Sequence, residues 1–262
     1  MRTLLVALQF LTRIPVTVDG ATEREIGRSA LCFPLVGFLL GGILLGFYVG
    51  AGYVFPPLVA RILAWVLLIL LSGAFHLDGL ADTVDGLYGG KDREDALRIM
   101  KDPHIGVMGV LAIGVSLLLK AAVGVVLPEP IFRAALVTLP VVGHSAMVAA
   151  LGFPYARAAG LGKVFADHRQ RLDIPLAAAL AIAVAFGLLK YAGLGALLAA
   201  AASSAILLSV AWRKIRGITG DVCGAVNEFA EIGYLLGLSA LAGVSFTSME
   251  RGLPQAFWRW HL

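Results

Sequence analysis

Long apolar runs, separated by short polar segments, follow one another along almost the whole of this chain. Each run approaches the roughly 20 residues that a transmembrane helix needs to cross the hydrocarbon core. The pattern predicts an all-α polytopic membrane protein with about seven transmembrane helices plus a short N-terminal interfacial helix. The expected spans are Leu31–Val54, a second helix from Pro57 into Asp78, Ile105–Leu127, Ala134–Phe153, Ile174–Lys190, Ala192–Trp212 and Ile232–Ser248.

The polar residues that interrupt or flank these runs refine the prediction. The N-terminal run is broken by Arg13, which favours a short helix at the membrane surface over a span. Thr22 followed by Glu25 is the pattern of a capping box and predicts a helix start. Lys120 and Lys190 lie close enough to span ends for their ammonium groups to reach the headgroup region.

Small residues predict one helix-packing face. Glycine recurs at every fourth position of the first span, at Gly42, Gly46 and Gly50. Such a stripe lets the backbone of another helix come close. It predicts packing and carries no chemistry.

The composition supports a membrane protein of one domain. Hydrophobic residues make up 59% of the 262 residues, charged residues 15%, and the mean hydropathy is +0.88. This is more apolar surface than one soluble core needs, so the lipid bilayer is an expected partner. The net charge of +4 is scattered, which argues against nucleic-acid binding. Cys32 and Cys223 lack a metal or redox spacing, and without repeats or linkers a single membrane-embedded domain, residues 1–262, is expected.

The distribution of Lys and Arg predicts the topology. In alternating connections, fifteen of the 21 basic residues fall on one side of the membrane and six on the other. Cytoplasmic connections are enriched in these residues, so the fifteen mark the cytoplasmic side of the membrane. Two polar segments with unusual chemistry, residues 76–104 and 213–231, then face the cytoplasm.

The first of these segments carries three regularly spaced carboxylates. Asp78, Asp82 and Asp85 stand at positions i, i+4 and i+7, so one face of a continuous helix presents all three. Their repulsion would be resolved by a divalent cation with an all-oxygen shell, Mg²⁺ or Mn²⁺. The alternative is a solvated helix end whose acids pair with nearby Lys and Arg side chains. The position directly after an apolar span, where ionisable groups are costly, favours a metal site for pyrophosphate chemistry.

Residues that follow and precede these carboxylates add candidate roles. Basic side chains that could neutralise pyrophosphate oxygens follow at Arg93, Arg98 and Lys101, where the positive-inside bias alone would also place them. Asp102 precedes the third span as a helix cap, a further ligand or a base. His76, two residues before the first carboxylate, is a candidate proton acceptor.

The second polar segment predicts another half of the same site. Asp221 and Glu228 are seven residues apart, on one helix face at the mouth of a span, with Asn227 beside Glu228. They could complete the metal site or orient a substrate. The alternative is an ordinary helix start capped by Asp221.

Four stretches of the chain carry a resemblance to a known family. They are FHLDGLADTVDG at residues 75–86, RIMKD at 98–102 followed by Gly-x-x-Gly, QFLTRIP at 9–15, and Gly220-Asp221-x-x-Gly224 with Asn227 and Glu228. These stretches resemble the cobalamin synthases, the adenosylcobinamide-GDP ribazoletransferases. Because they are spread from the N-terminal to the C-terminal part, the resemblance covers essentially the whole chain. The opening of the alcohol phosphotransferase motif, Asp82-x-x-Asp85-Gly86, is also present, but the rest of that motif does not follow.

The resemblance implies a reaction and a role for each candidate residue. The adenosylcobinamide phosphoryl group would pass from adenosylcobinamide-GDP to α-ribazole or its 5′-phosphate, releasing GMP and forming adenosylcobalamin or its 5′-phosphate. Such in-line transfer needs positioning and charge neutralisation more than covalent help. The expected Mg²⁺ ligands are Asp78, Asp82, Asp85, Asp221 and Glu228, the expected proton acceptor is Asp82, Asp85 or His76, and the expected substrate contacts are Arg93, Arg98, Lys101, Asp102 and Asn227.

Two other functions fit parts of the sequence. A different membrane transferase acting on a diphosphate, such as a prenyltransferase, could use similar carboxylates but would release pyrophosphate. A transporter would need polar groups near the bilayer midplane, whereas the predicted acids gather at one interface. The sequence leaves the oligomeric state open, a homo-oligomer included.

Overall fold

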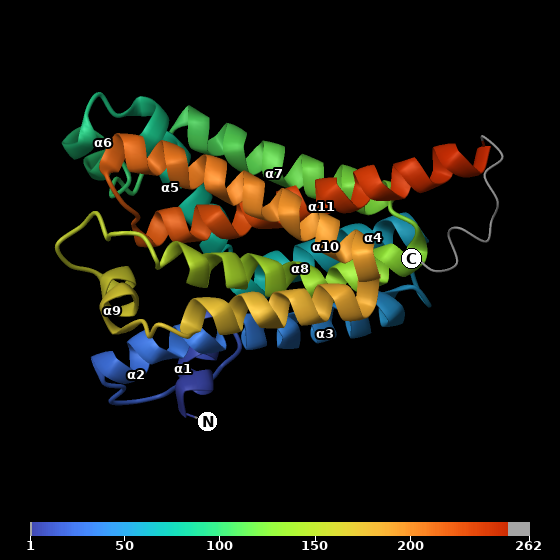
Figure 1. Ribbon diagram of the computed structural model, residues 1–262, viewed down its shortest axis with the longest axis horizontal. Coiled ribbons are helices and arrows are strands. Elements are labelled where there is room, and N and C mark those ends of the chain that lie inside the picture. Colours follow the sequence, from blue (N-terminus) through green and yellow to red (C-terminus); the bar gives the residue numbers. More distant parts are fainter. Residues whose placement is uncertain (1, 251–262) are drawn as a thin grey trace.

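The computed structural model describes residues 2–250, and within that range the chain is helical and contains no β-strand (Figure 1). The all-α fold predicted from the apolar runs is confirmed. In chain order the helices are α1 (Arg2–Leu11), α2 (Glu23–Arg28), the 3₁₀ helix η1 (Ser29–Cys32), α3 (Phe33–Ala51), α4 (Pro57–Ser72), α5 (Phe75–Gly89), α6 (Arg93–Ile99), α7 (Val107–Val126), α8 (Glu129–Ala150), α9 (Leu161–His168), α10 (Asp173–Ile215) and α11 (Gly220–Glu250).

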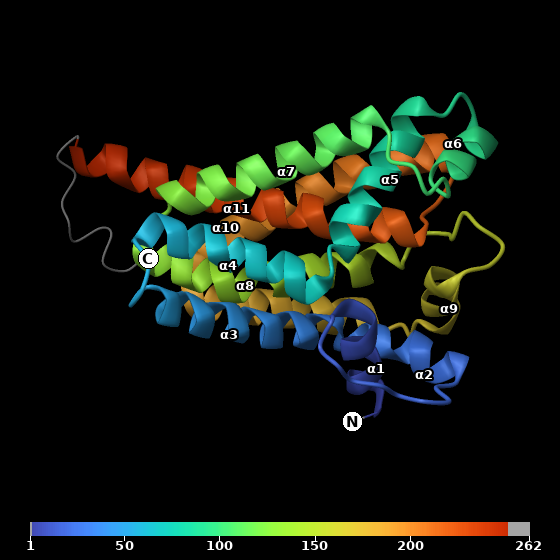
Figure 2. The ribbon, with the colours of Figure 1, turned by 180° about the vertical axis from the view of Figure 1, so that it is seen from behind.

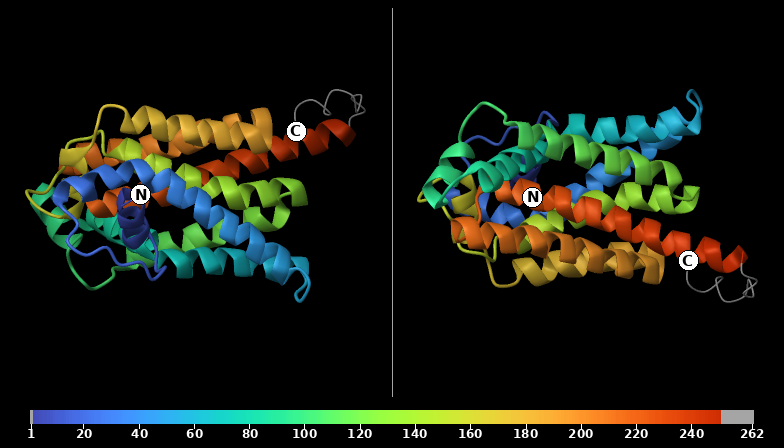
Figure 3. Two further views of the ribbon diagram at one scale, coloured as in Figure 1. Left: turned by 90° about the horizontal axis from the view of Figure 1, so that it is seen from below. Right: turned by 90° about the horizontal axis from the view of Figure 1, so that it is seen from above.

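The long helices run along one axis, and the short helices gather at one end of it (Figures 1 and 2). Helices α1, α2, α6 and α9 lie at the end where α10 passes into α11, and the α3–α4 and α7–α8 turns lie at the opposite end. Views from below and above show the same separation (Figure 3). The first end, called the polar end below, consists of residues 2–32, 74–106, 152–172 and 213–222. It contains the fifteen basic residues that predicted the topology.

The described helices are sufficient for a polytopic membrane protein. Four of them are long and apolar enough to cross a bilayer, and α4 with α5 makes a fifth if the bent pair is one span. A straight helix of the 43 residues of α10 would be about 65 Å long, twice the hydrocarbon thickness. It folds back at Lys190, where φ is 50° and ψ is −133°. If α10 counts as two arms and α11 as one pass, the number equals the predicted seven, although α11 is not among the helices found apolar enough to cross.

The second predicted helix is not continuous, and this corrects the sequence-based prediction. Beyond Ser72, both Gly73 and Ala74 adopt left-handed conformations, with φ of 63° and 58°. The Ala74 N–H donates to the Ile69 carbonyl at 2.9 Å and closes the end of α4. Helix α5 then departs at 82°. A Cβ on Gly73 would lie 2.2 Å from the Arg13 Nε, and the positive φ of Gly73 favours glycine at this position. The three carboxylates therefore belong to a separate helix at the polar end.

Within residues 2–250, the predicted glycine stripe does not face another helix. An added Cβ would meet nothing within 4 Å at Gly42, Gly46 or Gly50. The close contact of α3 is made instead by Gly37 and Gly41, where an added Cβ would lie 2.4 Å and 2.6 Å from carbonyl oxygens of α8. The first span therefore does pack closely against another helix, as predicted, but through a different face from the one that carries the predicted glycine stripe.

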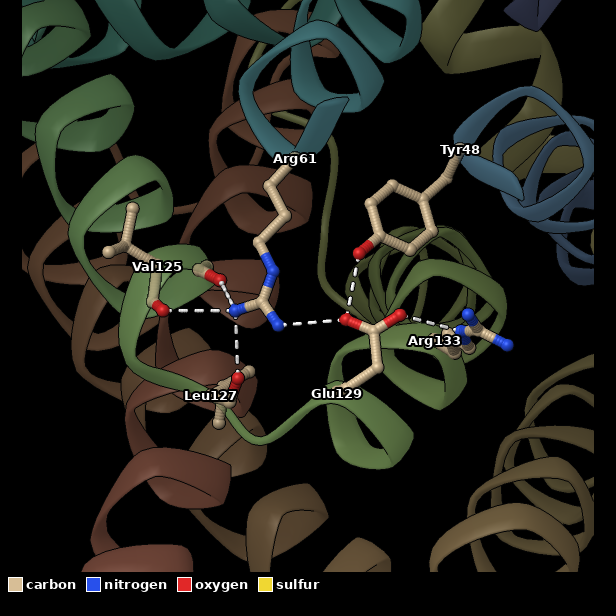
Figure 4. Close-up of polar contacts among 7 residues, drawn as sticks. Tyr48, Arg61, Val125, Leu127, Glu129 and Arg133 are labelled. Carbon is tan, nitrogen blue, oxygen red and sulfur yellow. Dashed lines mark hydrogen bonds and ion pairs between the residues drawn. The ribbon is translucent and has the colours of Figure 1, made fainter. Parts of the chain in front are cut away.

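At the opposite end, Arg61 joins four helices (Figure 4). Its Nη1 donates at 2.8–2.9 Å to three carbonyl oxygens at the end of α7, and its Nη2 pairs with Glu129 of α8 at 2.9 Å. Glu129 also accepts from the Tyr48 hydroxyl of α3 at 2.8 Å and from Arg133 at 2.7 Å. These contacts satisfy the carbonyl groups that a helix C-terminus leaves unpaired. The network is structural and lies far along the bundle from the predicted site.

Three local predictions are confirmed. The N-terminal segment forms the short helix α1. Thr22 and Glu25 form both hydrogen bonds of a capping box at the start of α2. Cys32 and Cys223 are free thiols.

Candidate active site

At the polar end, α5 and α11 cross with their backbones in contact. A Cβ on Gly79 would lie 2.8 Å from the Asp221 carbonyl oxygen, and one on Gly224 would lie 3.3 Å from the Gly79 Cα. Side chains at these two positions would force the helices apart. The crossing brings Asp78 and Asp82, one residue before and three residues after Gly79, beside Asp221 in the first turn of α11.

These three carboxylates, Asp78, Asp82 and Asp221, are called the acidic cluster. Asp82 interacts electrostatically with both Asp221 and Asp78. Asp78 is exposed, and the other two are partly buried. Like charges this close destabilise one another unless a cation compensates them. Among the described residues the ion pair from Arg157 is the only one made to the cluster, so the cluster keeps an excess of negative charge.

Arg157 reaches the acidic cluster from the connection between α8 and α9. Its Nη2 lies 2.9 Å from an Asp221 carboxylate oxygen, and 16% of its side chain is exposed. The connection is held against the α10–α11 turn by the Ala156 N–H, which donates to the Ile218 carbonyl at 2.7 Å, and by the Ile218 N–H, which donates to the Pro154 carbonyl at 2.9 Å. The buried Arg157 Nε has no hydrogen-bond partner within residues 2–250. The guanidinium therefore retains donor capacity for a ligand.

The start of α11 is shaped by two further side chains that sequence reasoning missed, as it missed the role of Arg157. The Thr219 hydroxyl accepts from the Val222 N–H at 3.2 Å, so Thr219 caps the helix and the alternative of a cap by Asp221 is wrong. The Tyr155 hydroxyl accepts from the Gly220 N–H at 3.2 Å. Burial raises the pKa of the Tyr155 phenol, which keeps it protonated. The only available signal was an aromatic and a basic residue in a predicted cytoplasmic connection, a common combination.

A cavity of about 500 Å³ lies beside the acidic cluster. This is within the usual size range of small-molecule sites. Its charged lining residues are Asp78, Lys101, Arg157 and Asp221. Its aromatic lining residues are Phe10, Phe33, Phe75, Tyr155 and Phe165. Gly220 also lines it, so the positive end of the α11 dipole faces the cavity.

Asp85 has a different position from the other two carboxylates of α5. Its two oxygens accept from the backbone N–H groups of Gly106 at 2.7 Å and Gly109 at 2.8 Å. An added Cβ on these glycines would lie 2.4 Å and 2.3 Å from the same carboxylate. Both oxygens thus bind the start of α7. The structure gives Asp85 the function of joining α5 to α7 and does not bring it into the acidic cluster as a ligand.

The basic residues predicted to contact phosphate are divided by the structure. Lys101 lines the cavity. Arg93 instead donates to two backbone carbonyl oxygens, one at the end of α10 at 3.0 Å and one beside Arg157 at 2.7 Å. Arg98 pairs with Asp95 on its own helix. Of the three, only Lys101 is free to meet a ligand in the cavity.

Asp102 is exposed and lies in the connection before α7. It accepts from the His104 N–H at 2.9 Å and lies 2.7 Å from the His104 Nδ1. These hydrogen bonds hold the pKa of Asp102 below its usual range. The N-cap of α7 is Gly106, so Asp102 does not cap that helix. It is not among the residues that line the cavity.

Glu228 lies apart from the acidic cluster, in a buried ionic group. Its carboxylate pairs with Lys120 at 2.8 Å, and Lys120 pairs with Glu231 at 2.6 Å. Lys120, Glu228 and Glu231 are called the buried triad. The Ser116 hydroxyl donates to Glu228 at 2.6 Å, and the Asn227 amide donates to Glu231 at 3.1 Å. Neither Glu228 nor Asn227 reaches the cavity, and Glu231 was not anticipated.

The buried triad also overturns the prediction that Lys120 extends to the headgroups. The Lys120 side chain is 8% exposed and points inward to α11. Ten residues separate Glu231 from Asp221, so the triad lies about 15 Å further along α11, near the depth of the bilayer midplane. At that depth, pairing with two carboxylates stabilises the Lys120 ammonium more than extension of the side chain to the headgroups would.

His76 is likewise separated from the acidic cluster. Its side chain is buried, and its ring packs edge-on against His144 with centroids 5.3 Å apart. It lines a second cavity of about 190 Å³ together with all three residues of the buried triad. The structure therefore does not place His76 where a hydroxyl group bound beside the acidic cluster could reach it.

The donor set of the acidic cluster fits a hard cation in type. Within residues 2–250, no three His, Cys, Asp or Glu side chains form a preassembled metal site. Magnesium, however, commonly uses one or two carboxylates and takes its remaining ligands from water and substrate phosphates. The cluster offers oxygen donors only, with unneutralised negative charge, and two of its three carboxylates lie on the wall of a cavity. It suits a cation that is shared with a bound diphosphate.

Comparisons with known proteins place the chain in a family. Residues 3–239 match the family described as cobalamin-5-phosphate synthase. The adenosylcobinamide-GDP ribazoletransferase of Pseudomonas syringae pv. syringae is 40% identical over 245 residues, which are 90% of this chain and 98% of that protein. The proteins of the same name from Pseudomonas aeruginosa and Pseudomonas putida are both 42% identical, over 91% and 89% of this chain and 98% and 97% of their own lengths. No solved structure matches the chain. The chain therefore belongs to the cobalamin-5-phosphate synthase family and is a transferase of cobalamin synthesis.

Proposed function

We propose that this chain transfers the adenosylcobinamide phosphoryl group from adenosylcobinamide-GDP to α-ribazole or its 5′-phosphate, releasing GMP and forming adenosylcobalamin or its 5′-phosphate. The curated relatives are named for this transfer. The observation that carries the proposal to this chain is the acidic cluster, two of whose carboxylates, Asp78 and Asp221, line one cavity with Arg157 and the start of α11. A diphosphate needs this combination of cationic donors and carboxylates that can hold its counterion.

Substrate binding follows from the charges on the cavity lining. Arg157 and Lys101 bind the non-bridging oxygens of the diphosphate, and the positive end of α11 adds to their field. Asp78, Asp82 and Asp221 would hold Mg²⁺, which supplies neutralisation of the diphosphate charge when bound. The ion pair between Arg157 and Asp221 keeps the guanidinium oriented before the substrate arrives.

The transfer itself requires alignment and one proton acceptor. A ribose hydroxyl that is free in both α-ribazole and its 5′-phosphate forms a bond to the cobinamide-side phosphorus while the bond from that phosphorus to the GMP oxygen breaks, and GMP leaves with the electron pair. The attacking hydroxyl must lose its proton. Of the three predicted acceptors, Asp85 is engaged by α7 and His76 is buried beside the triad. We assign the role to Asp82, which has no such engagement.

The proposed orientation has the polar end in the cytoplasm of a bacterial inner membrane. The segments that form this end contain fifteen of the 21 basic residues, which is the bias of cytoplasmic connections. The relatives are bacterial. Both substrates would then enter the cavity from the cytoplasm, without crossing the bilayer.

Purified protein in lipid vesicles, given adenosylcobinamide-GDP, α-ribazole and Mg²⁺, tests the proposal. We expect release of one GMP for each corrinoid product formed, and loss of turnover when a chelator removes Mg²⁺. Release of pyrophosphate, or substrate movement across the vesicle membrane without nucleotide turnover, would show a different function. Activity that persists in the chelator would refute the magnesium requirement and leave the transfer intact.

A further inference from the structure

Four phenylalanine rings from four helices converge on the cavity beside the acidic cluster. Phe10 of α1 contacts each of the others, with ring centroids 5.7 Å, 5.1 Å and 4.7 Å from those of Phe33, Phe75 and Phe165. All four line the cavity, and they are called the phenylalanine wall. Phe33 and Phe165 are buried, whereas Phe10 and Phe75 are partly exposed. The latter two therefore present ring surface to the cavity.

Other uncharged residues that line the cavity are also apolar. Met147, Leu151 and Cys223 contribute to the same cavity, and its charged members are confined to the four residues named above. A flat ring bound against such a surface gains burial and ring–ring contact. A guanine base bound against the wall would lose the hydrogen bonds that its amino and keto groups make to water, and phenylalanine rings have no donors or acceptors to replace them. The wall therefore favours an aromatic base with apolar edges.

We infer that the phenylalanine wall is the subsite for the aromatic base of the acceptor nucleoside, α-ribazole, and not for the guanine of the donor. The inference rests on the proposed function and assigns part of its site. Phe75 and Asp78 are three residues apart on α5, and so lie on the same face of the helix one turn apart. A base held on Phe75 directs its ribose toward the acidic cluster. The guanine portion of the donor is left to the exposed side of the cavity.

Steady-state kinetics of wall variants test this assignment. In Phe10→Leu and Phe75→Leu, removal of a stacking partner should raise the KM for α-ribazole by about three- to tenfold, with the KM for adenosylcobinamide-GDP unchanged. The matched control is Phe38→Leu on α3, because Phe38 is 50% exposed and does not line the cavity. A rise confined to the KM for adenosylcobinamide-GDP, or no change in either KM, would overturn the assignment. Thermal unfolding of each variant identifies losses that come from misfolding.

Direct binding separates the failure of this inference from failure of the proposed function. Equilibrium dialysis with α-ribazole alone should show binding to the wild-type protein, weaker binding to Phe10→Leu and unchanged binding to Phe38→Leu. GMP should fail to displace α-ribazole. If wild-type protein binds α-ribazole in this way but releases no GMP in the full reaction, the subsite stands and the proposed reaction fails. Displacement by GMP, or equal α-ribazole binding by wild type and Phe10→Leu, would refute the subsite whatever the turnover.

Discussion

The acidic cluster and the buried triad both combine carboxylates with a basic side chain, but the two groups have different functions. Both draw carboxylates from α11, and they lie about 10–15 Å apart along that helix. In the triad, one ammonium pairs with two carboxylates at 2.8 Å and 2.6 Å, and all three side chains are less than a tenth exposed. In the cluster, one guanidinium pairs with Asp221 alone among three carboxylates, and Asp78 and Asp221 line an accessible cavity. A carboxylate that is paired at depth holds helices together, and one left in excess beside a cavity is available for a ligand.

The difference follows from where the partner cations lie. Lys120 faces α11 from α7, and its ammonium holds the Glu228 carboxylate in the buried triad, away from the polar end. Arg157 comes from a surface connection and reaches only Asp221. Desolvation makes an unpaired charge far costlier in the triad than at the cavity. Substitutions in the two regions should therefore change different quantities: stability in the triad and turnover at the cluster.

The largest expected effect is on stability, from Lys120→Met. The substitution leaves two buried carboxylates without their ammonium partner, and should lower the free energy of unfolding by about 3–5 kcal/mol. The melting temperature in detergent or lipid nanodiscs measures the loss. The control is the triple variant Lys120→Met, Glu228→Gln, Glu231→Gln, which removes the charges together and should recover most of the stability. An unchanged melting temperature in Lys120→Met would contradict a structural role for the triad.

Next in size is the loss of turnover in Arg157→Gln. Removal of a guanidinium that binds the transferring phosphates should lower kcat/KM for adenosylcobinamide-GDP by about 100-fold, or about 3 kcal/mol, while Arg157→Lys retains part of the activity. GMP release gives the rates. Arg98→Gln is the matched control, since Arg98 pairs with Asp95 away from the cavity, and should be close to wild type. Equal losses in the two variants would show that Arg157 has no special part.

A smaller effect, on stability and activity, is expected at the crossing of α5 and α11. In Gly79→Ala the new Cβ would lie 2.8 Å from the Asp221 carbonyl oxygen, which forces α5 from α11 and should cost about 1–3 kcal/mol of stability together with activity. Gly46→Ala, whose Cβ meets nothing within 4 Å, should be neutral or stabilising by up to about 1 kcal/mol. Chemical unfolding compares the two. Tolerance of alanine at position 79 would mean that the crossing is looser than described.

The smallest effect is expected at Asp85, whose role is to bind the start of α7. Asp85→Ala should destabilise the protein by about 0.5–2 kcal/mol, the value of a lost helix cap, and leave kcat within a few-fold of wild type. The melting temperature and the rate of GMP release together decide between cap and ligand. A collapse of kcat without loss of stability would assign Asp85 to the metal after all.

The fold was largely predictable because bilayer thickness and apolar runs restrict each span. The acidic cluster was predictable in part: Asp78 and Asp82 stand out as acids after an apolar run, and Asp221 as an acid at the mouth of another. What separates them from Asp85 and Glu228 is tertiary. The bend at Gly73 turns α5 across α11, and Lys120 draws Glu228 inward.

Arg157 could not be selected from sequence for a related reason. Its position depends on backbone hydrogen bonds between its connection and the α10–α11 turn, and two such irregular segments leave no periodic pattern. Gly217, where a Cβ would lie 2.3 Å from the Pro154 carbonyl oxygen, is the one local requirement of that contact. Its meaning is clear only once both segments are seen together.

The rate of GMP release by Asp82→Asn, measured across a magnesium titration, tests the central claim most directly. The variant keeps the shape of the side chain and removes one charge from the acidic cluster, so kcat should fall by about 10²–10³-fold with no loss of melting temperature. Glu94→Gln, an exposed carboxylate on α6, serves as control and should keep the wild-type rate at every magnesium concentration. If Asp82→Asn retained the full rate at low magnesium, the acidic cluster would not be the site of transfer.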